Sequence, residues 1–86
     1  MTYKEKMLKI DKLHEECNTS CAKIDASLKI NLKKVIRLYD RGSISLTEKY
    51  NSMQKYISFA KSAVDAAYIH KFQSIEEIAR EEAANE

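Results

Sequence analysis

The stretch Tyr39–Tyr50, YDRGSISLTEKY, decides how this chain folds. Gly42 can adopt the left-handed conformation that commonly ends a helix. Ser45 followed by Glu48 is a capping box, in which the Ser45 hydroxyl accepts from the amide of residue 48 and the Glu48 carboxylate accepts from the amide of Ser45. The stretch therefore predicts a helix, a turn of about three residues and a second helix.

On both sides of the turn, a seven-residue repeat recurs at alternating steps of four and three, as in a coiled coil. Its members before the turn are Tyr3, Met7, Ile10, His14, Cys17, Cys21, Ile24, Leu28, Asn31, Val35 and Leu38, and those after it are Leu46, Tyr50, Met53, Ile57, Ala60, Val64 and Ala67. The strict repeat would next reach Lys71, whereas the apolar residues continue through Tyr68, Phe72, Ile75 and Ala79. This difference predicts a stutter that shifts the buried face of the second helix.

Together these signals predict an all-α fold, a single domain over residues 1–86 that forms an antiparallel two-helix hairpin with a coiled-coil-like seam. We expect a helix over about residues 2–41, a turn over about 42–44 and a second helix over about 45–83. The chain has no Pro and one Gly. Asn18, Thr19 and Ser20 have modest helix propensity, and they leave open an alternative with a break there and three helices.

The segment that holds both cysteines, residues 17–27, falls opposite residues 60–70 when the chain folds about its turn. Both segments are rich in small side chains. Small side chains that face one another let helix axes approach toward the short end of the usual ~8–10 Å. We therefore expect a narrow waist in the middle of the hairpin.

The chain has more apolar side chains than one seam between two helices can bury. Surplus apolar surface on a wide helical face is typical of a helix that packs on further helices. A second chain could supply them in a four-helix bundle, or a partner protein could do so; a monomer with scattered exposed apolar groups is the remaining alternative. We expect the partner-binding residues to be Leu32, Ile36, Tyr39, Tyr56, Phe59 and Phe72.

These features predict a non-enzymatic protein–protein interaction module, a small helical adaptor, inhibitor or chaperone that buries a partner's helix on its apolar face. The partner would be another protein, a second copy in a homodimer, or both. A structural subunit of a larger helical assembly is an alternative. The sequence has no Gly-rich phosphate loop, no HExxH and no nucleophile with an identifiable base, so we expect no enzymatic activity and no cofactor.

A row of cations before the turn indicates a different function. The cations that could contact phosphates, along ~18 Å of helix, are Lys29, Lys33, Lys34, Arg37 and Arg41. The alternative function is a nucleic-acid-binding homodimeric four-helix bundle. We rank it second, because charge rows on exposed helix faces usually serve solvation and no pattern for reading bases accompanies this one.

His14, Cys17 and Cys21 recur on one helical face, with His70 opposite, and these are the ligand types of a tetrahedral zinc site. Their spacing is not that of a CxxC knuckle, and cysteines also serve as small apolar side chains. We therefore expect no metal and keep these four residues only as a weak alternative.

The compartment is predicted from the N-terminal sequence and from the length of the apolar runs. The N-terminus has no continuous apolar core of the kind that signal peptides carry, and no apolar run approaches the ~20 residues of a membrane span. We expect a cytoplasmic protein that does not bind membranes.

Overall fold

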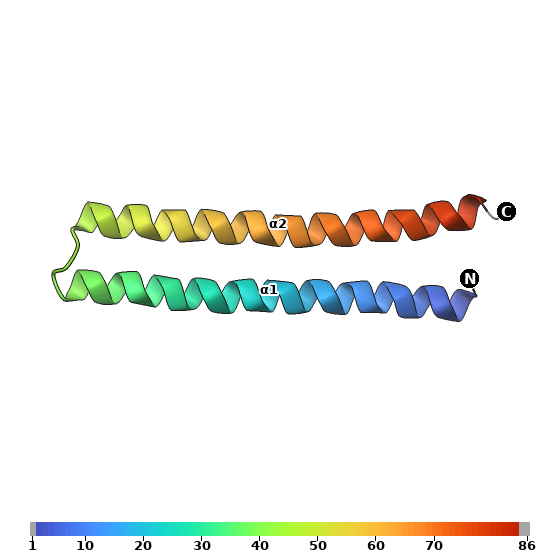
Figure 1. Ribbon diagram of the computed structural model, residues 1–86, viewed down its shortest axis with the longest axis horizontal. Helices are drawn as coiled ribbons and strands as arrows, with labels where there is room; N and C mark the ends of the chain where they lie inside the picture. The colour runs from blue at the N-terminus through green and yellow to red at the C-terminus, as the bar shows by residue number, and fades with distance from the viewer. Residues whose placement is uncertain (1, 85–86) are drawn as a thin grey trace.

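The computed structural model describes residues 2–84, apart from the side chains of Glu82 and Ala84. Helix α1 spans Tyr3–Asp40 and helix α2 spans Leu46–Ala84. The two helices run antiparallel, side by side in a single layer, and both ends of the chain lie at the same end of that layer (Figure 1). The molecule measures 65 × 17 × 8 Å between Cα atoms. The predicted all-α two-helix hairpin is confirmed.

The turn has the capping interactions that its sequence predicts. Gly42 has φ 76°, its amide donates to the carbonyl of Tyr39 at 2.9 Å, and the amide of Ser43 donates to the carbonyl of Leu38 at 2.9 Å; this pair of bonds is a Schellman motif. The Ser45 hydroxyl accepts from the Glu48 amide at 3.1 Å, and the Glu48 carboxylate accepts from the Ser45 amide at 3.3 Å. The capping box is confirmed, and these local bonds reverse the chain.

Helix α1 continues without interruption through Asn18, Thr19 and Ser20. The alternative with three helices is therefore wrong. The three residues are exposed and carry only a modest propensity penalty. Cys17 on one side of them is buried in the seam and Cys21 on the other is half-buried, so packing against α2 maintains the helix.

The core is a thin seam, and it drifts around α1. Its buried apolar side chains are Cys17, Val35 and Ile78. His14 and Leu38 are exposed, whereas their neighbours Leu13 and Tyr39 are half-buried. A straight α-helix drifts ~20° per heptad against a strict seven-residue repeat, so over about five heptads the seam moves by about one residue position. The repeat therefore located the middle of the seam and missed its ends.

The predicted stutter in α2 is wrong, because the strict repeat continues to Lys71. The Lys71 side chain is 8% exposed and Ile78 is buried, while Phe72 and Ala79 are exposed. The long aliphatic part of a lysine can fill an apolar seam while its charged end reaches outward. Here the Lys71 ammonium lies 4.5 Å from the ring centroid of Tyr68 and 5.1 Å from that of Phe72.

Candidate interaction surfaces

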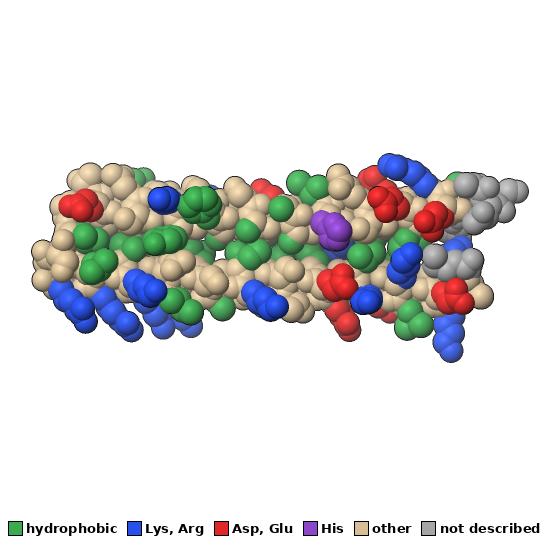
Figure 2. Space-filling view, viewed as in Figure 1, with side chains coloured by type: hydrophobic (Ala, Val, Ile, Leu, Met, Phe, Trp, Pro, Cys, Tyr) green, Lys and Arg blue, Asp and Glu red, His purple; other side chains and the backbone are tan. Residues whose placement is uncertain are grey.

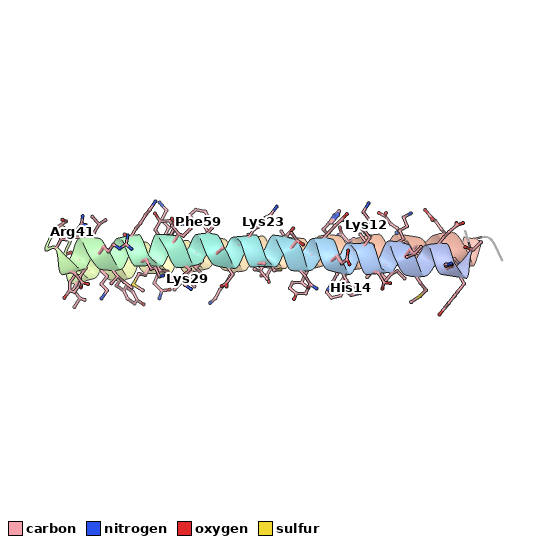
Figure 3. The ribbon with its side chains drawn as sticks, turned by 90° about the horizontal axis from the view of Figure 1, so that it is seen from below. Lys12, His14, Lys23, Lys29, Arg41 and Phe59 are labelled. Atoms are coloured by element: carbon pink, nitrogen blue, oxygen red, sulfur yellow. The ribbon has the colours of Figure 1, made fainter. Side chains whose placement is uncertain are left out.

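The flat hairpin exposes two broad faces, one on each side of the helical layer. Lys12, Lys23 and Phe59 project toward one of them, and His14 and Lys29 project toward the other (Figure 3). We call the face with Lys12, Lys23 and Phe59 the groove face and the opposite one the back face.

The six residues predicted to bind a partner do not share one face. Phe59 and Tyr56 border the same groove on the groove face. Phe72 follows Phe59 by thirteen residues, which is a rotation of about 220° and places it on the back face. Ile36 follows Lys29 by seven residues, so it too lies on the back face. Leu32 and Tyr39 are half-buried near the seam, so a single partner helix cannot contact all six.

Two grooves open between the helices on the groove face. The turn groove, nearer the turn, is lined by Lys23, Ile24, Ser27, Leu28, Asn31, Tyr56, Phe59, Ala60 and Ala63. The terminal groove, nearer the chain ends, is lined by Lys12, Leu13, Glu15, Glu16, Cys17, Thr19, Ser20, Ala67, His70 and Lys71. Figure 2 views this face and shows one His side chain on it, in agreement with the place of His70 in the lining of the terminal groove.

The grooves occur where the sequence has small side chains. Ala60 and Ala63 line the turn groove, and Ser20 and Ala67 line the terminal groove. Because short side chains fill little of the space above the seam, they leave hollows on a face that nothing covers. The cysteine-containing segment, residues 17–27, therefore contributes side chains to the lining of both grooves, and the narrow waist stays a prediction.

The hairpin has far more surface than a compact protein of its size. Its accessible surface is 6771 Å², whereas a compact monomer of 9.9 kDa exposes about 5,200 Å². Twelve large apolar side chains among the described residues are exposed, against the three that form the core. The excess of about 1,600 Å² is twice the ~800 Å² that each partner contributes to a standard interface.

The two cysteines lie one helical turn apart and interact with each other. Burial and the neighbouring Cys17 thiol raise the pKa of Cys21 above its usual value, and the nearby Lys71 ammonium partly opposes this. His14 projects to the back face (Figure 3), whereas His70 lines the terminal groove. No group of three or more His, Cys, Asp or Glu side chains among residues 2–84 could hold a metal ion, so the four residues of the zinc alternative do not come together.

The cations that could contact phosphates are exposed along α1 near the turn, and the lower left of Figure 2 shows a gathering of Lys and Arg side chains on this part of the molecule. None of the five, Lys29, Lys33, Lys34, Arg37 and Arg41, has an ion-pair partner within the described part of the chain. Two ion pairs elsewhere, Lys12–Glu16 at 4.0 Å and Arg80–Glu76 at 3.5 Å, each join residues one helical turn apart. The charge of these five cations is therefore not neutralised by an ion pair among the described residues.

Folding concentrates charge of opposite sign at the two ends of the hairpin. The half nearer the turn, residues 23–64, carries nine Lys and Arg against three Asp and Glu, a net +6. The half nearer the termini, residues 1–22 and 65–86, carries six against ten, a net −4. The chain's small net charge of +2 therefore hides a large dipole along the 65 Å axis.

Sequence reasoning missed three residues that shape the groove face. Leu13 was missed because the strict repeat assigns its neighbour His14 to the seam, and a 3.6-residue period would have found it. Lys71 was missed because the neighbouring apolar residues Tyr68, Phe72, Ile75 and Ala79 favoured a shifted seam, although the strict seven-residue repeat includes Lys71. Lys23, beside Phe59 at the turn groove, gives no sequence signal that separates it from the other lysines.

Neither helix contains, within its described residues, an apolar stretch long enough to cross a membrane. No family model matches the chain, and no curated protein or solved structure matches it significantly.

Proposed function

We propose that this chain is a non-enzymatic protein–protein interaction module that buries an amphipathic helix of a partner against an apolar face of the hairpin. It would act as an adaptor, an inhibitor or a chaperone, in each case by covering the apolar side of the partner's helix. A helix that docks in a groove uses apolar anchors at i, i+3, i+4 and i+7. The turn and terminal grooves, with the apolar side chains around them, suit such a ligand.

The observation that carries this proposal is the excess of about 1,600 Å² of surface over a compact monomer of this mass. A core of three buried apolar side chains gives little stability by itself, since a small single core rarely supplies more than ~3–5 kcal/mol. Covering the exposed apolar side chains would contribute ~25 cal/mol per Å² of apolar area. Association would therefore add to the small stability that the seam supplies.

One substitution on each broad face tests the proposal. Phe59→Asp places a charge on the groove face and Ile36→Asp places one on the back face. Ala26→Asp is the matched control, because residue 26 is about 200° from both Ile24 and Leu28 and so faces away from the seam. Amphipathic helical peptides selected from a display library against the wild-type chain would serve as ligands, with affinity measured by calorimetry.

We expect at least one face substitution to weaken peptide binding or self-association by tenfold or more, and the control to change neither by more than about twofold. Far-UV circular dichroism would establish that each variant is still helical. The proposal is wrong if both Phe59→Asp and Ile36→Asp leave peptide binding and self-association intact.

A second candidate function is nucleic-acid binding by a homodimer, and the five unpaired cations of α1 favour it. Counterion release would make such binding weaken steeply with salt. Titrations of duplex DNA and of RNA hairpins at two salt concentrations test it, with Lys33→Glu/Arg37→Glu against Lys4→Glu/Lys9→Glu at the other end of α1 as control. The absence of any affinity at low salt excludes this function.

A further inference from the structure

We infer that the groove face is covered by a second copy of this chain, turned end for end so that the turn of one hairpin lies over the chain ends of the other. The two-fold axis would run across the helices, between the two stacked layers and halfway along their length. This inference rests on the proposed function, because it names one occupant for an apolar face. It goes further by fixing the face, the orientation and the register.

Charge selects the orientation. Two flat hairpins stacked by the same face can have their turns at the same end or at opposite ends. With turns together, a half that carries +6 lies on another +6, and −4 lies on −4. With turns at opposite ends, each +6 half lies on a −4 half. Like charges placed together oppose association and complementary charges favour it, so the arrangement with turns at opposite ends is preferred.

The register follows from the position of Phe59. Its side chain is 64% exposed and leaves α2 six residues, or about 9 Å, on the turn side of the middle of that helix at residue 65. A two-fold axis through this middle brings residue 59 of one chain over residue 71 of the other. Residues 67–71 form the α2 wall of the terminal groove. The most exposed aromatic ring on this face thus meets a hollow in the second copy.

The back face meets itself less favourably in the same operation. Its hollow on α2 is lined by Ala60, Lys61, Val64 and Asp65, so a two-fold axis through residue 65 would set Asp65 of one copy over Asp65 of the other, and like charges placed together oppose association. A second, mainly apolar hollow of this face, lined by Tyr3, Lys6, Met7, Ile10, Ile75, Ile78 and Ala79, lies near the chain ends. The groove face has room for a stable dimer, because a layer with Cα extents of 65 × 17 Å offers about 1,100 Å², above the ~800 Å² of a standard interface.

Absolute molar mass by light scattering tests the choice of face. We expect the wild-type chain to be a dimer at micromolar concentration with its thiols reduced. Phe59→Asp should raise the dissociation constant at least about a hundredfold, because the two-fold axis places two altered residues in each dimer. The matched control is Phe72→Asp, which removes the same ring from a position 55% exposed on the back face, and it should change the constant less than about threefold.

Zero-length cross-linking of the wild-type chain tests the orientation without any substitution. Lys55 precedes Phe59 by one helical turn and lies on the same side, and Glu77 follows His70 by two turns. Within one chain these two residues are 22 positions apart in α2, or about 33 Å. The proposed axis brings residue 55 of one chain over residue 75 of the other, so a carbodiimide bond between Lys55 and Glu77 forms only between chains.

Three results would overturn the inference: a wild-type monomer at about 100 μM, a Phe59→Asp dimer as tight as wild type, or cross-links that join turn to turn. Salt separates the orientations as well, since the dissociation constant should rise between about 50 and 500 mM NaCl if opposite charges face each other and fall if like charges do. A monomer that still loses peptide binding on Phe59→Asp or Ile36→Asp would retire only this inference and leave the proposed function standing.

Discussion

Replacing Gly42 measures how strongly the turn directs the fold. Gly42 has φ +76°, and a Cβ built on it meets no atom within 4 Å. The cost of Gly42→Ala is therefore conformational alone, without a steric clash. The left-handed conformation costs an L-residue ~1–2 kcal/mol, and the loss of chain entropy in the unfolded state returns ~0.4–1 kcal/mol. We expect the free energy of unfolding to fall by about 1 kcal/mol, roughly a fivefold change in the folding equilibrium.

Two further residues at the same position separate backbone strain from other causes. Asn tolerates the left-handed conformation better than Ala, so Gly42→Asn should cost about half as much as Gly42→Ala. A D-alanine introduced by chemical ligation prefers positive φ and should raise the free energy of unfolding by ~0.4–1 kcal/mol. The open space around residue 42 lets all three be compared without repacking.

Urea unfolding followed by far-UV circular dichroism, at one fixed chain concentration, gives these differences. Equal fractions of dimer must be present in each sample, because association adds to apparent stability. An Ala variant as stable as wild type, or a D-alanine variant less stable than the L-alanine one, would show that the backbone strain at Gly42 does not limit this turn.

Three other predictions follow from the seam, the cap and the thiols. Ile78→Ala, at a position 5% exposed, should lower the free energy of unfolding by about 2–3 kcal/mol, whereas Leu8→Ala, at a position 62% exposed, should lower it by less than about 0.5 in the same urea titration. Ser45→Ala removes the acceptor of the Glu48 amide and should cost about 1 kcal/mol, and Ser45→Asp, which keeps an acceptor, should restore most of it. Because burial and the Cys17 thiol raise the pKa of Cys21, its alkylation at pH 8, followed by mass spectrometry, should be slower than that of a free cysteine peptide. The raised pKa also favours folding below the usual thiol pKa, and this contribution should be lost as the pH rises through the raised value.

The turn and its caps were predictable because their interactions join residues close in sequence. Ser45 and Glu48 are three positions apart, and the amide of Gly42 donates to a carbonyl three residues back. Such bonds depend on residue type and backbone conformation and not on the rest of the fold. The buried seam positions Cys17 and Val35 were also predictable. They lie within a few heptads of the middle of α1, where the rotation of a straight helix against the seven-residue repeat is still small.

The faces were harder to predict, because small rotations accumulate along a long helix. A drift of ~20° per heptad puts Leu13 in the seam in place of His14. Because the sequence does not give the rotation of each helix, it also predicted Ile36 and Phe59 on one surface. The structure places them on opposite faces, so the proposed partner site divides into two. Lys71 shows a further limit, since a charged residue was excluded from the seam although its aliphatic part packs there.

The sequence by itself therefore determined two long helices, the turn that reverses the chain and the opposed charges that folding gathers at its two ends. All of these depend on local bonds or on composition. Only the tertiary structure decided which side chains are buried, where the two grooves open and which apolar residues share a face. These depend on the rotation of each helix about its own axis, and contact between the helices sets that angle.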